Sequence, residues 1–373
     1  MLDLNMRIAS LAVVSLVFAC GTPSSPEDAG TTGGGATGGG AATGGGAATG
    51  GGAATGGGAA TGGGAATGGG AATGGGGGAT TDAGVTTCPA TGMGAITAPA
   101  GCFVFTPVDT GASAQGDNAT DNHYALEPAG TPRNTLLLFF NASLASPSRQ
   151  IPDATQNFYN AAANSGFHVL AIAYSSTQVL GITCNNDAPC FAKARKTIIR
   201  GIAEPGVAQG LANIREDEGV VWRLDAALQR LAQSRPGQGW DQFLQAGATP
   251  EARLVTTKMA TAGHSQGGGH AAFFAKLYPV TRVVQLSSTC DVTSGNTPAP
   301  WTSDGQWMTP PATTFVGFAT MGDTICPGHV AIWTAMGMSA SREFDDAQVC
   351  NGASSHTGSI NCPMNYAKWL TLF

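Results

Sequence analysis

Several residue types are scarce in this 373-residue chain, and each scarcity narrows its possible functions. Charged residues make up 11% of the chain, and 17 Lys and Arg stand against 23 Asp and Glu, for a net charge of −6. No basic stripe runs along the sequence, which argues against nucleic-acid binding. Neither a Cys-x-x-Cys pair nor a His-Glu-x-x-His motif is present, so a zinc signature is lacking. We therefore expect no nucleic-acid partner and no metal.

The first twenty residues have the pattern of a secretion signal. Arg7 precedes the apolar run 8–19, which is too short to span a bilayer. The end of this run, Val17-Phe18-Ala19-Cys20, resembles a bacterial lipobox, in which the cysteine is lipidated and becomes the mature N-terminus. We predict a signal peptide over 1–20 and membrane attachment through lipidated Cys20. The expected location is the cell envelope outside the cytoplasm, on the outer membrane or the cell surface, with secretion as the alternative.

Residues 21–81 contain no apolar side chain that can build a core. Six perfect copies of Ala-Ala-Thr-Gly-Gly-Gly run from residue 41 to residue 76. Such a composition cannot offset the entropy lost on ordering the chain, so we predict a disordered linker. About sixty residues of this kind have a root-mean-square reach of roughly 40–45 Å, which suits a tether between a membrane anchor and a folded domain.

The segment 82–373 is long enough for one α/β domain. It contains eight cysteines, and an even number favours disulfides in a protein outside the cytoplasm. Pairing sequence neighbours predicts the bridges Cys88–Cys102, Cys184–Cys190, Cys290–Cys326 and Cys350–Cys362. Eight cysteines allow 105 pairings, so other connectivities stay open at this point.

Hydrophobic patterns in this segment alternate between strands and helices. Residues 135–140, Thr-Leu-Leu-Leu-Phe-Phe, form an unbroken apolar run typical of a strand buried on both faces. Residues 153–165 have helical spacing and 167–174 form a second buried strand, which predicts a βαβ unit with parallel strands. Further strands are expected near 103–105, 123–127, 259–262, 282–287, 314–320 and 342–349. Further helices are expected near 191–200, 217–233, 271–277, 330–338 and 366–373.

The pattern Gly263-His264-Ser265-Gln266-Gly267 is the strongest functional signal. An expected strand precedes it, and an apolar helix follows it. A G-x-S-x-G motif between a strand and a helix is typical of a nucleophile elbow, which holds its serine in a strained conformation above the sheet. The two outer glycines let the strand and the helix approach closely. We therefore predict that Ser265 is a nucleophile.

A serine nucleophile needs a histidine as its base and an acid that orients this histidine. In α/β-hydrolases the acid and then the histidine follow the serine along the chain. His356, in a loop of small residues, is the predicted base, and His329 is the alternative. Asp323, directly after an expected strand, is the predicted acid, and Asp291, which follows an earlier strand, is the alternative.

The oxyanion of the tetrahedral intermediate needs two backbone N–H donors. The N–H of Gln266, which follows the nucleophile, is the first predicted donor. The second is expected from Asn141 and Ala142, directly after the strand 135–140. A simple strand-end cap is the alternative role for Asn141.

Four short motifs occur in one succession: the elbow, Pro300-Trp301, Asp323-Thr324 and Ala353-Ser354-Ser355-His356. This succession resembles the α/β-hydrolases, and most of all their branch of dienelactone hydrolases and bacterial cutinases (polyester hydrolases). The resemblance implies an α/β-hydrolase fold, with a mostly parallel central sheet and helices on both faces. It also implies a Ser-His-Asp esterase in which Trp301 lines the substrate cleft. Loop packing is the alternative role for Trp301.

Together these features predict a lipid-anchored serine esterase that hydrolyses carboxylic esters through an acyl-enzyme. The substrate is expected to be a small-molecule, lipid or polymer ester, and the chemistry requires no cofactor. Two other functions stay open: a serine peptidase or amidase on the same fold, and a surface lipoprotein that binds a ligand without turnover.

Overall fold

The computed structural model describes residues 86–87, 101–144, 154–350 and 354–373. The chain divides into the units 1–76 and 77–373, and every described residue belongs to the second unit. The predicted signal peptide 1–20 with Cys20 and the predicted linker 21–81 lie outside the described residues, and the domain boundary at residue 82 stays a prediction. Within the described ranges, no helix is both long enough and apolar enough to cross a bilayer.

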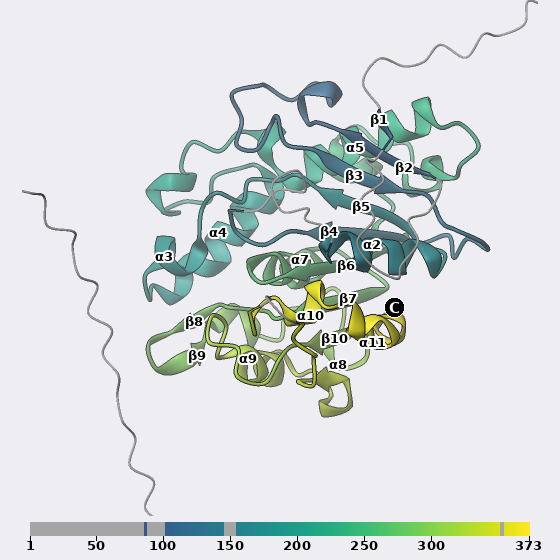
Figure 1. Ribbon diagram of the computed structural model, residues 1–373. Helices are drawn as coiled ribbons and strands as arrows, with labels where there is room; N and C mark the ends of the chain where they lie inside the picture. The colour runs from purple at the N-terminus through teal and green to yellow at the C-terminus, as the bar shows by residue number, and fades with distance from the viewer. Residues whose placement is uncertain (1–85, 88–100, 145–153, 351–353) are drawn as a thin grey trace, which may run out of the picture. The chain divides into compact units, whose positions relative to one another are not determined.

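A nine-stranded sheet forms the centre of the described domain, and its strands follow one another across the view in Figure 1. In spatial order they are β1 (Thr86–Thr87), β2 (Cys102–Phe105), β3 (His123–Leu126), β5 (His168–Ile172), β4 (Leu136–Phe140), β6 (Met259–His264), β7 (Arg282–Leu286), β10 (Phe315–Phe318) and β11 (Glu343–Phe344). The first three neighbour pairs are antiparallel. All five pairs from β5–β4 to β10–β11 are parallel. The sheet is therefore mostly parallel, as predicted.

Strand β4 explains why the central strands are apolar at every position. Leu136, Leu138 and Phe140 belong to the core on one face of the sheet, and Leu137 and Phe139 belong to the core on the other face. Successive side chains of a strand point to opposite faces, so a strand covered on both sides needs an apolar residue at every position. The run 135–140 has this pattern because both faces are covered.

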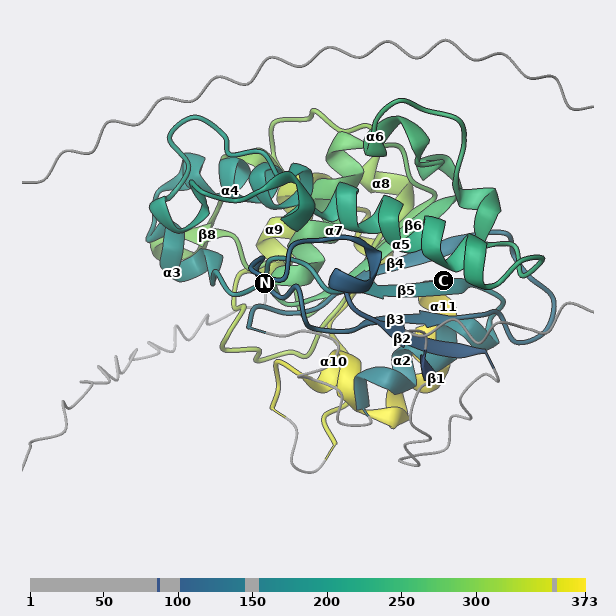
Figure 2. The same ribbon diagram turned by 90° about the horizontal axis from the view of Figure 1, so that it is seen from above.

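Helices cover the two faces of the sheet, as Figure 2 shows. One core contains residues of α3 (Leu180–Cys184), α4 (Ala188–Arg200), α5 (Val220–Ser234), α7 (Gln266–Leu277) and α9 (His329–Met336). The other contains residues of α2 (Ala154–Asn164), α10 (Gly358–Asn361) and α11 (Tyr366–Leu372). Shorter elements are α6 (Pro250–Arg253), α8 (Pro311–Thr314) and the hairpin of β8 (Val292–Thr293) and β9 (Thr297–Pro298). This three-layer arrangement confirms the predicted α/β fold class.

Three disulfides are present among the described residues: Cys184–Cys190, Cys290–Cys326 and Cys350–Cys362. They are three of the four bridges predicted from sequence neighbours. Cys102 is also disulfide-bonded, and its predicted partner Cys88 lies outside the described residues.

Strand β11 is shorter than the sequence predicts. Only Glu343–Phe344 pairs with β10, whereas the expected strand covered 342–349. Beyond it the chain forms a single bridge between Asp346 and Thr320. Asp345 and Asp346 are exposed at this edge of the sheet. Backbone hydrogen bonds continue past β11, because the N–H of Met321 donates to the carbonyl oxygen of Asp345 at 2.9 Å and the N–H of Ala347 donates to that of Ala319 at 3.0 Å.

Candidate active site

Ser265 occupies a sharp turn between β6 and α7. It has φ 55° and ψ −128°, directly between the last residue of the strand and the first residue of the helix. A positive φ is strained for a residue with a side chain, so the surrounding structure must hold it. The Ser265 N–H donates to the carbonyl oxygen of Leu286 on the neighbouring strand at 3.0 Å. This geometry is that of a nucleophile elbow.

Two glycines of the motif permit the turn. A Cβ atom on Gly263 would lie 2.4 Å from the backbone of Gly267. A Cβ atom on Gly267 would lie 2.2 Å from the carbonyl oxygen of Phe140, at the end of β4. No larger residue fits at either position unless β4, β6 and α7 move apart, which confirms the steric reason for glycine at these positions.

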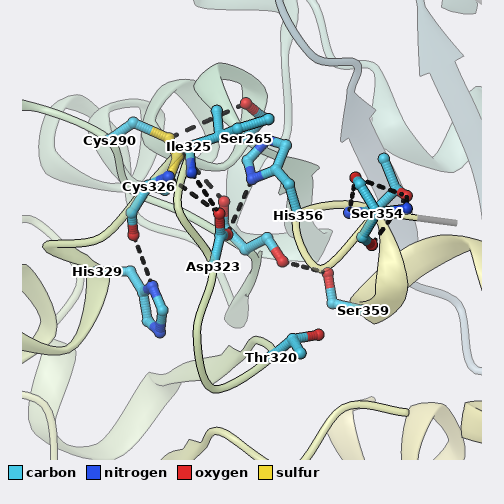
Figure 3. Close-up of polar contacts among 12 residues, drawn as sticks. Ser265, Cys290, Thr320, Asp323, Ile325, Cys326, His329, Ser354, His356 and Ser359 are labelled. Atoms are coloured by element: carbon cyan, nitrogen blue, oxygen red, sulfur yellow. Dashed lines mark hydrogen bonds and ion pairs between the residues drawn. A yellow bond between two sulfur atoms is a disulfide. The ribbon is translucent and has the colours of Figure 1, made fainter. Parts of the chain in front are cut away.

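Asp323 and His356 form a hydrogen-bonded pair beside the elbow (Figure 3). His356 Nδ1 lies 2.8 Å from Asp323 Oδ2, while Oδ1 accepts the N–H groups of Ile325 at 2.9 Å and Cys326 at 3.0 Å. Burial raises the pKa of Asp323, but the hydrogen bonds from His356, Cys326 and Ile325 and the charge of His356 bring it below its ordinary value. An ionised Asp323 accepts the proton on Nδ1, which leaves Nε2 of His356 as the basic nitrogen.

The serine completes one cluster with this pair. In Figure 3 the imidazole of His356 lies between Asp323 and Ser265. Ser265 Oγ lies 3.9 Å from Sγ of Cys290, which is bonded to Cys326. The sulfur of Cys326 in turn lies within 4.8 Å of the nearest ligand atoms of Asp323 and His356. Within the described residues Ser265 Oγ makes no hydrogen bond to His356, and in serine hydrolases this bond often forms only in the complex with substrate.

His264 holds the loop that carries His356. Its Nε2 lies 2.9 Å from the backbone oxygen of His356, and the two ring centroids are 4.8 Å apart. Burial, followed by the charge of His356, lowers the pKa of His264 to about 4. The ring is therefore neutral at neutral pH, and its Nε2–H donates to that carbonyl. This role of His264 is not among the roles predicted from the sequence, although its place directly before Ser265 is a signal that points to it.

The alternative acid and base have other partners. Asp291 accepts two N–H groups of Arg195, at 2.5 and 2.6 Å, and the indole N–H of Trp301 at 2.8 Å. His329 begins α9, and its Nδ1 lies 2.8 Å from the backbone oxygen of Cys326. Neither alternative belongs to the acid–histidine pair.

The predicted oxyanion donors lie at the ends of α7 and β4. Gln266 is the first residue of α7, so its N–H has no acceptor within the helix. Asn141 and Ala142 are buried, and Asn141 Oδ1 accepts the hydroxyl of Tyr159 at 2.9 Å. The residue of this segment that lines the cavity at the serine is Ser143, which the sequence analysis did not name. Gly267 of α7 packs directly against the backbone oxygens of Phe140 and Asn141. The segment after β4 therefore reaches the cavity only after Asn141, at Ser143.

A cavity of about 150 Å³ opens at Ser265. Its walls and floor are formed by Ser143, Val179, Leu180, Gly181, Arg195, Gln266, Cys290, Asp291 and Ile325. The loop before α3 is held there by the Gln266 side chain, whose Oε1 accepts the N–H of Leu180 at 2.8 Å. The residue after the nucleophile therefore positions one wall of the cavity.

Trp301, which the resemblance places in the substrate cleft, lies behind this cavity instead. It is 3% exposed, it donates to Asp291, and its ring packs against Phe273 at 5.0 Å between centroids. Trp301 is not among the residues that line the cavity at Ser265. The structure thus replaces the predicted cleft contact with a supporting one. The reason is that α4 and α7 bring Arg195 and Phe273 against Trp301 from distant parts of the sequence.

One group of potential metal ligands lies close together within the described ranges, namely Asp323, Cys326 and His356. The sulfur of Cys326 is bonded to Cys290, so it is not a thiolate ligand. Asp323 is hydrogen-bonded to His356. These residues fit an acid–histidine pair better than a metal site.

The sheet, the elbow after β6 and the later acid and histidine have the arrangement of the α/β-hydrolase fold. A scan against protein-family models and a search of curated proteins each find no match. Three solved structures that resemble this chain are described as a serine hydrolase homologue or as esterases.

The first is an alpha-beta serine hydrolase homologue from Coxiella burnetii, with 12% identity and a TM-score of 0.38 over 74% of this chain and 99% of that chain. The second is esterase B from Lactobacillus rhamnosis, inhibited by a tributyrin phosphonate. It has 11% identity and a TM-score of 0.43, and the match covers 74% of this chain and 85% of the esterase chain. The third is the esterase domain of a Rhodothermus marinus protein. It has 15% identity and a TM-score of 0.35, and the match covers 69% of this chain and 94% of the esterase domain. Likenesses this distant carry no argument about activity, and the closer resemblance to cutinases and dienelactone hydrolases stays a prediction.

Proposed function

We propose that this protein is a serine esterase that hydrolyses carboxylic esters through an acyl-enzyme. The observation that supports it most is the strained Ser265 at a nucleophile elbow, beside the hydrogen-bonded pair of Asp323 and His356. A serine hydroxyl is a weak nucleophile, and such a pair supplies the base that activates it.

The proposed reaction has two steps. Nε2 of His356 takes the proton of Ser265 while Oγ attacks the acyl carbon, and the N–H of Gln266 with one from the segment after β4 stabilises the oxyanion. His356 then gives this proton to the leaving alcohol. Water, deprotonated by the same nitrogen, cleaves the acyl-enzyme and releases the carboxylic acid. Asp323 stays ionised throughout and stabilises the imidazolium.

The test compares purified protein with the Ser265→Ala variant on p-nitrophenyl butyrate. Loss of a catalytic serine lowers kcat by about 10⁶-fold in serine hydrolases, so the variant should have almost no activity. Labelling by a fluorophosphonate probe should disappear in the same variant. Turnover of p-nitroanilides but not of esters would favour a peptidase or amidase instead. Absence of both turnover and labelling in folded wild-type protein would favour a binding protein.

We also infer that Cys20 carries a lipid and that the domain functions outside the cytoplasm. The lipobox-like sequence supports the first statement, and the three disulfides support an oxidising compartment. Detergent phase separation tests the anchor: wild-type protein should enter the detergent phase and the Cys20→Ser variant should not. Equal partition of both into the aqueous phase would contradict it.

A further inference from the structure

The cavity at Ser265 points to the class of ester that fits the site. We propose that it is the acyl-binding pocket and that it limits the substrate to esters of short acids, with up to about six non-hydrogen atoms attached to the acyl carbonyl group. This inference rests on the proposed function. It adds that the enzyme selects its substrate by the acid part of the ester and not by the alcohol part.

The position of the cavity relative to the base assigns it to the acyl group. The leaving alcohol must lie near Nε2 of His356, because this nitrogen protonates it. The oxyanion must lie near the N–H of Gln266. The cavity is lined by Ser265, Gln266 and Ser143, and His356 is not among its lining residues. It therefore opens beside the serine and the segments expected to bind the oxyanion, without a wall formed by the imidazole, and there we place the acyl substituent of the tetrahedral intermediate.

The size and the walls of the cavity suit a short apolar chain. Its volume is about 150 Å³. An apolar cavity of about this volume in another protein holds one benzene molecule, which has six non-hydrogen atoms. Val179, Leu180 and Ile325 supply apolar wall, together with the disulfide sulfur of Cys290. A butyryl, hexanoyl or benzoyl group matches this space.

A buried ion pair, Arg195 with Asp291, belongs to the lining of the cavity. Arg195 is fully buried and Asp291 is 2% exposed. Arg195 also donates to the carbonyl oxygen of Gln266 at 3.1 Å, and Asp291 accepts the indole N–H of Trp301. A Cβ on Gly269 would lie 2.1 Å from a guanidinium nitrogen, so α7 packs closely on the pair. Moving Arg195 away from Asp291 would leave uncompensated buried charge, which costs free energy. We therefore expect this ion pair to stay in place and to limit the length of the acyl chain.

Two wall positions allow the pocket to be resized. Gly181 lies in α3 and lines the cavity, and a Cβ placed on it meets no atom within 4 Å, so Gly181→Leu introduces a side chain at this wall and replaces glycine by a better helix former. Ile325 is 63% exposed, and Ile325→Ala widens the wall without emptying the core. Ile182 is the matched control, because it is the neighbour of Gly181, is 77% exposed and does not line the cavity.

The experiment measures kcat/KM for p-nitrophenyl esters from acetate to decanoate and for the benzoate. Wild type should be fastest on butyrate to hexanoate and at least about tenfold slower on octanoate, the usual effect of methylene groups that exceed the size of an apolar pocket. Gly181→Leu should shift the acyl length with the highest kcat/KM towards acetate. Ile325→Ala should raise kcat/KM for octanoate relative to that for butyrate. Ile182→Ala should keep the wild-type profile. Butyrate esters of alcohols of increasing size should differ much less.

Failure of this inference can be told apart from failure of the proposed function. Ser265-dependent hydrolysis with octanoate and decanoate as fast as butyrate would overturn the acyl pocket and leave the esterase intact. Hydrolysis that depends on the size of the alcohol, with Gly181→Leu changing the preference for the alcohol and not that for the acyl chain, would assign the cavity to the leaving group instead. No hydrolysis of any ester by folded wild type would overturn the proposed function and the pocket together.

Discussion

Replacing Cys290 and Cys326 by alanine is expected to reduce kcat in protein that remains folded. The N–H of Cys326 is one of two backbone donors to Asp323, at 3.0 Å, and the bridge ties this loop to Cys290, which lies 3.9 Å from Ser265 Oγ. One hydrogen bond to a charged group contributes about 1.5–3 kcal/mol, and each 1.4 kcal/mol is tenfold in rate, so loss of this alignment should lower kcat about 10- to 100-fold.

The same change also lowers the free energy of unfolding. The chain-entropy relation gives about 4 kcal/mol for the bridge Cys290–Cys326, whose cysteines are 36 residues apart. It gives about 2 kcal/mol for the control bridge Cys184–Cys190, with a separation of 6. The control removes a disulfide between two cysteines whose backbone N–H groups do not bind Asp323. Both double variants should therefore be less stable, but only the first should have an impaired triad.

The assay is kcat on p-nitrophenyl acetate, at a temperature where circular dichroism shows both double variants to be folded. The control bridge joins the end of α3 to α4, and two residues of α3 line the cavity. Acetate is chosen as substrate because a small acyl group depends least on this wall. Thermal unfolding supplies the stability of each variant. Equal losses of kcat in the two variants, or wild-type kcat without the Cys290–Cys326 bridge, would refute the argument that this disulfide positions the acid.

Three further predictions follow from the geometry. Asp323→Asn should lower kcat about 10⁴-fold in an ester assay with little loss of stability, whereas Asp291→Asn should lower the free energy of unfolding by about 3–5 kcal/mol, measured with denaturant, because a buried guanidinium loses its charged partner. Burial lowers the pKa of His123 to about 3 and that of His264 to about 4, so both are neutral in the folded protein. In the unfolded chain both histidines bind a proton below about pH 6.5. As the pH falls from there to the folded-state pKa of each histidine, the free energy of unfolding should decrease by about 1.4 kcal/mol per pH unit for each of them. Unfolding by denaturant at a series of pH values measures this decrease. Gly267→Ala should cost about 1–3 kcal/mol in thermal unfolding and also reduce kcat, because its Cβ would lie 2.2 Å from a backbone oxygen of β4.

Each of these predictions has a clear contrary result. Equal activity losses in the two aspartate variants would contradict the assignment of the acid. A free energy of unfolding that stays constant between about pH 6.5 and pH 4.5 would contradict neutral buried histidines. Wild-type stability and kcat in the glycine variant would contradict the close packing of α7 on β4.

Local rules are enough to read the elbow from the sequence. Ser265 lies between a strand and an apolar helix, and the glycines around it have a steric reason that concerns only neighbouring residues and one adjacent strand. The same is true of β4, whose unbroken apolar run follows from burial on both faces. Three of the predicted disulfides join cysteines that are neighbours in the cysteine sequence and are bonded in the structure.

The composition of the site depends on contacts between distant parts of the chain, which no local pattern encodes. Asp291 and Asp323 both follow strands, and only the folded chain pairs Asp291 with Arg195 of α4 and leaves Asp323 to His356. In the same way Trp301 lies behind the cavity because α4 and α7 meet there. Parallel strands remote in sequence bring the loops that follow them to one edge of the sheet, and the packing of these loops and of α4 decides which polar groups meet. The sequence by itself therefore determined the fold class and the position of the elbow at Ser265, whereas the tertiary structure decided which carboxylate pairs with His356 and which residues line the cavity.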